Sequence, residues 1–196
     1  MIVLALDTAL DACSVAIVRD DAVLADLSER MQRGQAERLA PMAREAAATA
    51  GVTFSELDRI AVTTGPGSFT GVRVGLSFAR ALALALGKPC IGVSTLEALA
   101  LQEGEEGLHA ALIETPGAAY CALYENGAPL VAPRGIAHGE HEKLLSDAVN
   151  GRRFTLAGPN VIVDAAALAR RAVRLDPQNY KPDPLYLRAP HVTLPA

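Results

Sequence analysis

Residues 63–73 read TTGPGSFTGVR, with three glycines and a proline between a short apolar run and a long one. A glycine-rich turn from a strand into a helix commonly binds phosphate, because the first amides of a helix point outward and carry partial positive charge. This stretch lacks the Lys-Ser/Thr pair of a Walker loop, so it supplies no ammonium group to a phosphate. The sequence favours a second interpretation, in which the glycines permit positive φ and close backbone approach, and Ser68 or Thr70 caps the helix.

The order of apolar runs around this stretch predicts an α/β fold. Before it, three runs joined by short polar connections are typical of an antiparallel meander, and an alanine-rich helix follows them. After it, an apolar helix leads into one more strand and one more helix. The predicted elements are strands 2–7, 13–19 and 22–28, helix 35–50, strand 59–63, helix 72–86, strand 89–93 and helix 94–103.

The second half repeats the opening pattern in a shorter form. Its predicted elements are strands 108–114, 118–125 and 129–132, helix 138–149, strand 154–157 and helix 164–174. A three-stranded meander that occurs twice indicates a duplicated βββαβα topology with the second copy shortened. The stretch EGEEG at 103–107 predicts a boundary between an N-terminal lobe at 1–104 and a C-terminal lobe at 108–196. The proline-rich tail at 182–196 is expected to run extended over the surface.

Composition restricts the class of protein further. The chain has 196 residues, 51% of them hydrophobic, and a net charge of −4, so it is not expected to bind nucleic acid by itself. Asp7 interrupts the first apolar run too early for a signal peptide, and Arg73 and Arg80 interrupt the longest candidate for a membrane span. Three widely spaced cysteines form neither a disulfide framework nor a zinc ribbon. These features predict a cytoplasmic protein with no membrane partner.

Several stretches together resemble one known family. They are ALDTALDACSVAI at 5–17, ERLAPM at 37–42, TTGPGSFTGVRVGLSFARALA at 63–83, GVSTLEALA at 92–100 and PLYLR at 184–188. In these stretches the chain is similar to the TsaB (YeaZ) family, whose members share the two-lobed fold of actin, Hsp70 and the sugar kinases. The match is dense over the first hundred residues and sparse after them.

The resemblance implies a function without catalysis. Members of the family are accessory subunits of the complex that transfers a threonylcarbamoyl group to the tRNA adenosine next to the anticodon. The resemblance implies a catalytic paralogue, TsaD, and an ATPase, TsaE, as partners, with tRNA reached only through the complex. It also implies a homodimer when TsaD is absent, and no cofactor.

The first hairpin carries an incomplete phosphate-binding pattern. Asp7, Thr8 and, across the turn, Ser14 match the acidic and hydroxyl positions of ATP-using relatives. A working site needs oxygen ligands from both lobes, whereas the second lobe offers IETPGAAY with Glu114 and no paired glycines for an adenosine loop. The sequence favours a structural relic at Asp7 and Thr8. The alternative is a small ATP-dependent kinase or carbamoyl transferase that uses these two residues.

The helix predicted at 72–86 has too narrow a polar strip for a surface helix. Arg73, Ser77 and Arg80 occupy one strip, and apolar side chains cover nearly all the rest. We therefore expect this helix and helix 35–50 to form half of an intermolecular bundle, which the resemblance assigns to TsaD or a second copy. The predicted interface residues are Gln35, Arg38, Met42, Gly75, Ala79, Leu82, Ala83 and Leu86. Plain internal packing remains the alternative, as does a homodimer with an unrelated regulatory role.

Metal and hydrolase chemistry find no support in the sequence. HGEHE at 138–142 does not match the spacing of zinc-protease signatures, and a solvated helix start explains it better. The chain has four scattered histidines, from which no Ser-His-Asp or Cys-His arrangement can be argued. We therefore predict neither a metal site nor a catalytic residue.

Overall fold

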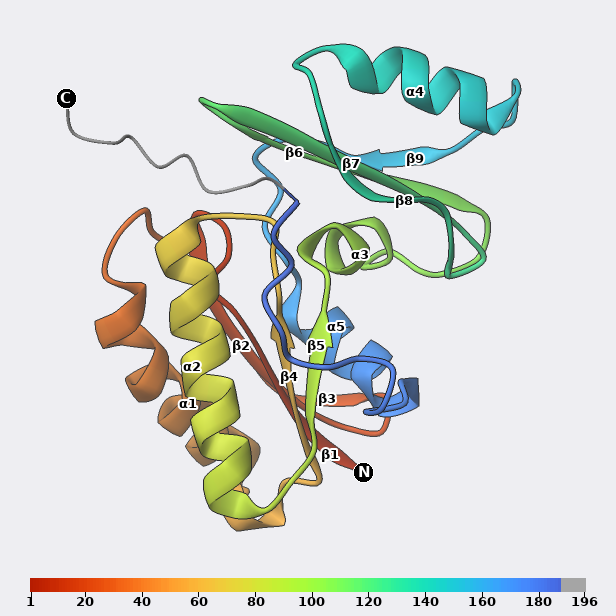
Figure 1. The fold of residues 1–196 in the computed structure, drawn as a ribbon. Helices are drawn as coiled ribbons and strands as arrows, with labels where there is room; N and C mark the ends of the chain where they lie inside the picture. Colours follow the sequence, from red (N-terminus) through yellow and green to blue (C-terminus); the bar gives the residue numbers. More distant parts are fainter. Residues whose placement is uncertain (188–196) are drawn as a thin grey trace, which may run out of the picture.

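The computed structural model describes residues 1–187, which form two β-sheets with helices around and between them (Figure 1). The first sheet has the strand order β3-β2-β1-β4-β5. Strands β1 to β3 are antiparallel, and β4 and β5 run parallel to β1. Its elements are β1 (Ile2–Asp7), β2 (Ala12–Arg19), β3 (Ala22–Arg30), α1 (Gln35–Ala50), a 3-10 turn (Phe54–Glu56), β4 (Arg59–Thr63), α2 (Phe69–Leu86), β5 (Cys90–Val93) and α3 (Thr95–Ala100).

The second sheet has four strands in the order β8-β7-β6-β9 and repeats the antiparallel meander of the first. Strand β9 pairs parallel to β6, as β4 pairs to β1. The elements are β6 (Leu108–Thr115), β7 (Ala118–Glu125), β8 (Ala128–Ile136), α4 (Glu140–Val149), β9 (Thr155–Ala157) and α5 (Ala165–Arg174). Within the described residues, no strand of this sheet corresponds to β5. Helix α5 packs on the first sheet, so it does not lie beside α4 as α2 lies beside α1. The second lobe is therefore the shortened one.

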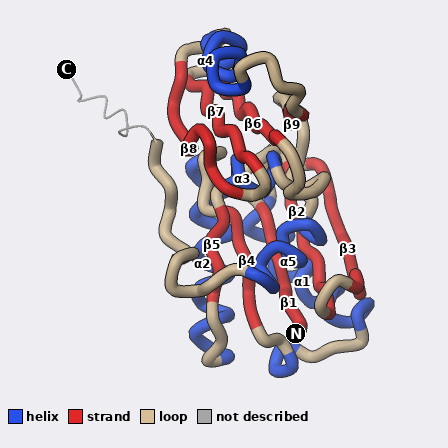
Figure 2. Tube along the Cα trace, turned by 90° about the vertical axis from the view of Figure 1, so that its right-hand side faces the viewer, coloured by secondary structure: helices blue, strands red, loops and turns tan. Residues whose placement is uncertain are grey.

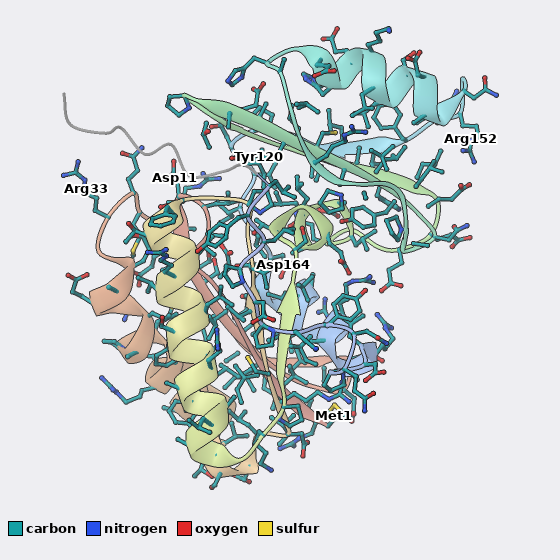
Figure 3. All side chains as sticks on the ribbon, viewed as in Figure 1. Met1, Asp11, Arg33, Tyr120, Arg152 and Asp164 are labelled. Atoms are coloured by element: carbon teal, nitrogen blue, oxygen red, sulfur yellow. The ribbon has the colours of Figure 1, made fainter. Side chains whose placement is uncertain are left out.

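Helices α1 and α2 lie side by side on one face of the first sheet (Figure 1). The other face carries α5, which comes from the second half of the chain, while α3 from the first half packs on β6 and β7. Asp164, at the start of α5, lies between the two sheets (Figure 3). One apolar core therefore fills the space between the sheets, with members from both halves, among them Val3, Ile91, Ile113 and Leu168.

The predicted elements are all present, with shifted ends. Helix α2 begins at Phe69 instead of Val72, because Ser68 is its N-cap and accepts a hydrogen bond from the Gly71 amide. Helix α3 ends at Ala100, well before the predicted end at Glu103. Of the proline-rich tail, residues 182–187 are described, and the rest of the predicted extended segment lies outside the described residues.

Within the described part of the chain, α2 is the single helix long and apolar enough to cross a membrane by length and composition. Helices that cover a sheet pass the same test, and α2 rests one face on the first sheet. The finding therefore does not place the chain in a membrane.

Candidate functional site

The glycines of residues 63–73 let the start of α2 pack directly on the turn between β1 and β2. A Cβ atom added at Gly67 or Gly71 would overlap the carbonyl oxygens of Ala9 and Thr8. The Ser68 amide donates to the Ala9 carbonyl at 2.7 Å, and the Thr8 hydroxyl donates to the Gly71 carbonyl at 2.7 Å. The Ser68 and Gly71 amides, which could meet an anion at a helix start, are thus paired inside the chain.

Asp7 lies at the end of β1 and is fully buried. Its Oδ1 accepts hydrogen bonds from the Thr63 hydroxyl at 2.5 Å and the Ala9 amide at 3.1 Å, whereas Oδ2 has no partner. Burial raises the pKa of this carboxyl to about 6, and the bonds from Thr63 and Ala9 oppose the rise. Ser14, opposite Asp7 on β2, is also buried and shares a 2.8 Å hydrogen bond with Ser28. This arrangement supports a structural role for Asp7.

A cavity of about 200 Å³ lies where the two lobes meet. The turn after β1 lines it with Ala9, Leu10 and Asp11, and the second lobe lines it with Glu114 and residues 158–162. Asp11 lies at the end of the first sheet nearest the second sheet (Figure 3). Asp7 does not line the cavity, so the carboxyl that the sequence singles out does not face the cleft between the lobes.

The small-residue seam of α2, formed by Gly75, Ala79 and Ala83, is buried within the chain, which corrects its predicted placement on a partner helix. Gly75, Ala79 and Ala83 are buried inside the single chain, and Met42 of α1 is fully buried as well. A Cβ atom at Gly75 would lie 2.7 Å from the Thr8 hydroxyl oxygen. The seam is small because the helix backbone approaches the sheet closely there.

The outer face of α2 is exposed. Leu84 is 86% exposed, and Leu82 and Leu86 are half-buried. Its other exposed residues after the first turn are Arg73, Ser77, Arg80, Ala81 and Ala85. At the start of the helix, the Arg73 guanidinium lies 3.7 Å from the ring centre of Phe69, which is 54% exposed. Ala81, Leu84 and Ala85 thus form an exposed apolar patch on this face, beside the polar side chains of Arg73, Ser77 and Arg80.

Two predicted interface residues of α1 already have partners within the chain. Arg38 donates to Glu29 of β3 at 2.6 and 2.9 Å. It also donates to Glu45, seven residues further along α1, at 2.8 Å. The side-chain amide of Gln35 donates through Nε2 to the Met31 carbonyl at 3.0 Å. Both residues are half-buried, and the bonds to Glu29 place Arg38 on the side of α1 that faces β3, the edge strand of the first sheet.

A second cavity, of about 320 Å³, lies at the start of α2 and was not expected from the sequence. Residues 65–67, Phe69, Val72 and Arg73 line one side of it, and Tyr120 of β7 and residues 185–187 line the other. The segments that form it are far apart in the chain, and no periodic pattern links them. The ring centres of Phe69 and Tyr186 lie 6.2 Å apart at this cavity.

The described residues hold no group of three or more His, Cys, Asp or Glu side chains suited to a metal ion. His138 lies 3.6 Å from Glu114, and His141 is half-buried on α4. The HGEHE stretch therefore does not gather its side chains around a common point.

Comparison with known proteins gives three kinds of match. The family model described as "TsaD: tRNA N6-adenosine threonylcarbamoyltransferase" matches residues 27–122. The chain is 36% identical to tRNA threonylcarbamoyladenosine biosynthesis protein TsaB of Escherichia coli (strain K12), over 100% of this chain and 82% of that protein. It is 43% identical to the protein of the same name from Haemophilus influenzae, over 50% of this chain and 41% of that one. The crystal structure of YeaZ from Pseudomonas aeruginosa superposes with a TM-score of 0.74 at 27% identity, over 95% of this chain and 99% of that one.

The two sheets, each with an antiparallel meander and a parallel strand and with helices exchanged between them, define a two-lobed α/β protein with the fold of YeaZ from Pseudomonas aeruginosa. The predicted fold class is confirmed. Within that class the chain belongs to the TsaB family, because the similarity to the E. coli protein extends over its whole length. The resemblance stated from the sequence motifs is thus confirmed.

Proposed function

We propose that this chain is a non-catalytic subunit in the biosynthesis of threonylcarbamoyladenosine in tRNA. The similarity over its full length to a protein with that role in its name carries the proposal. The geometry at Asp7 supports the absence of catalysis, because this carboxyl is buried, accepts a hydrogen bond from Thr63 and does not line the cavity between the lobes. The same burial weighs against the alternative of a small kinase or carbamoyl transferase that works through Asp7 and Thr8.

The subunit acts by binding a TsaD-type transferase through the outer face of α2 and the adjoining edge of α1. The exposure of Leu84, with Leu82 and Leu86 beside it, supports this surface. Gln35 and Arg38 of α1 take part in the same proposed contact. When the transferase is absent, a second copy of the chain covers the same face. A TsaE-type ATPase joins the complex, and tRNA contacts it through the transferase. The complex is cytoplasmic, and this chain itself needs no cofactor.

The proposal is tested by charge insertion on the exposed face of α2. Leu84→Arg should abolish binding to the TsaD-type transferase of the same cell, measured by size exclusion with light scattering. It should also abolish self-association and the modified adenosine in a reconstituted reaction. Leu130→Arg is the matched control, because Leu130 is 43% exposed on β8, in the other sheet. If wild type and Leu84→Arg support the same level of modification with equal binding, α2 is not the contact surface. If the reaction proceeds fully without this chain, the proposed function itself is wrong.

A further inference from the structure

The described C-terminal segment, residues 180–187, runs from the first lobe to the second. The Gly92 amide of β5 donates to the Tyr180 carbonyl at 2.9 Å, and the Leu185 amide donates to the Thr64 carbonyl at 2.8 Å. Beyond these bonds, Leu187 lines the same cavity as Tyr120 of the second sheet. The segment thus passes alongside β5, the edge strand of the first sheet, and continues toward the second sheet (Figure 2).

The beginning of this segment is attached to a buried ion pair. Arg171 of α5 donates through Nε and Nη2 to the Glu97 Oε1 atom of α3, at 2.8 and 2.6 Å. The Tyr180 hydroxyl donates to the same oxygen at 3.2 Å. Arg171 and Glu97 are each 8% exposed. A second carboxylate, Glu105, accepts from Nη1 of Arg171 at 2.8 Å.

The ion pair also connects the two sheets. Helix α3 packs on the second sheet and α5 on the first, so the bond between Glu97 and Arg171 joins elements that belong to different sheets. A rotation of one lobe against the other would separate two charges that are removed from water. Separation of a buried pair carries a large desolvation cost, so the network favours a single arrangement of the lobes.

Gly92 shows how closely the segment lies against β5. A Cβ atom at this position would overlap the Lys181 carbonyl oxygen and would lie 2.7 Å from the Pro182 Cα atom. The backbone of Gly92 does not adopt a positive φ. The glycine is therefore required for the approach of residues 181–182 and not for a turn.

We propose that residues 180–187 form a strap that, with the Glu97–Arg171 ion pair, holds the two lobes in one fixed arrangement. The strap also pairs with Thr64, directly before the loop that leads into α2, so it couples the position of α2 to the second lobe. The chain is then a rigid frame that presents its surface without closure of the cleft between the lobes. This inference does not depend on the identity of the partner that α2 binds.

The experiment uses the full chain with three substitutions. Gly92→Ala displaces the strap from β5, and Tyr180→Phe removes only the hydrogen bond to Glu97. Tyr186→Phe is the matched control, since it removes a hydroxyl of the same strap that is exposed and contacts Arg73 at 3.4 Å. Amide hydrogen exchange is followed by NMR at Gly92 and Leu185 in wild type and the two tyrosine variants, and at Leu185 in Gly92→Ala. Spin labels at Thr49→Cys on α1 and Ser146→Cys on α4, in a Cys90→Ser background, report the distance between the lobes.

We expect Tyr180→Phe to accelerate exchange at Gly92 and Leu185 by about tenfold, because a hydrogen bond to a charged acceptor is lost. Exchange in the central strands β1 and β4 should stay unchanged, and Tyr186→Phe should match wild type. The spin-label distance distribution should be narrow in wild type and broader in Gly92→Ala. If Gly92→Ala does not fold, the exchange rates in Tyr180→Phe decide. Unchanged exchange at both amides in Tyr180→Phe, or a wild-type distance distribution already as broad as that of a hinged protein, overturns the proposal.

Discussion

Asp7 is a carboxyl group in a position that water does not reach. One oxygen accepts from Thr63 and Ala9, and the other has no partner, so the charged form is poorly compensated. Its pKa rises from 3.8 to about 6, which means that the folded chain keeps a proton that the unfolded chain releases. The contribution of this group to stability is therefore complete below about pH 4 and is lost as the pH rises to about 6.

Asp7→Asn should remove this pH dependence. The shift corresponds to about 3 kcal/mol, so the variant should gain stability relative to wild type between pH 4 and pH 6.5. The difference in melting temperature between variant and wild type, measured across this range, tests the expectation. Asp11→Asn, an exposed residue of the same turn, is the control and should show no such trend. A difference that stays constant with pH would falsify the assignment of a buried, poorly compensated carboxyl.

At the scale of single elements, α2 has one face buried in the chain and one face exposed to solvent. Its inner face is made of the buried residues Gly75, Ala79 and Ala83, and a Cβ atom added at Gly75 would meet Thr8 and Val62 of the first lobe. Its outer face carries Leu84, which is 86% exposed, whereas Leu82 and Leu86 are partly buried against the core. The sequence of the helix is apolar over most of its surface because its buried face and the exposed patch of Ala81, Leu84 and Ala85 are both apolar, while Arg73, Ser77 and Arg80 are exposed on the same outer side.

Ala79→Arg should therefore unfold the chain instead of merely blocking an interface. A guanidinium placed in the fully buried position 79 has neither room nor a partner, and the expected loss of stability is several kcal/mol, about 4 or more. Ala81→Arg, on the exposed side of the same helix, should leave folding intact. Circular dichroism and thermal melting of the two variants measure the difference. A folded Ala79→Arg variant would show that the helix is rotated from the orientation described.

At the scale of the whole molecule, the cavity between the two lobes is lined by Asp11 and Glu114, whereas Asp7 is not among its lining residues. Purified alone, the chain should hydrolyse no ATP. Asp7 is fully buried, so Glu114 of the second lobe would face a metal-bound phosphate in the cavity without a carboxylate ligand from Asp7. A phosphate-release assay of wild type and Asp7→Ala tests this expectation. Turnover by the wild type that the substitution abolishes would contradict the proposed non-catalytic role.

The charge of the molecule leads to a separate expectation for RNA. With a net charge of −4, the isolated chain should bind tRNA weakly and without specificity at physiological salt. A gel-shift titration at two salt concentrations measures this binding. Tight binding by the isolated chain would require a basic surface that its charge does not suggest.

The sequence by itself determined the order and type of the elements, the duplication and the family. Local signals suffice for these properties, because hydrophobic period, turn residues and the cap at Ser68 act within a few residues of one another. The motif at 63–73 also indicated correctly that its glycines serve close backbone approach, since Gly67 and Gly71 pack on the β1–β2 turn.

Only the tertiary structure decided which side of each element faces the core. The helical pattern placed Gly75, Ala79 and Ala83 on one strip, but an apolar strip looks the same whether a sheet or a partner covers it. The exchange of α3 and α5 between the sheets, the ion pair of Glu97 and Arg171 and the path of residues 180–187 were likewise not predictable. The packing of α5, the ion pair and the path of residues 180–187 depend on contacts between residues more than 70 positions apart. Such contacts are selected by the packing of the whole chain and leave no local pattern in the sequence.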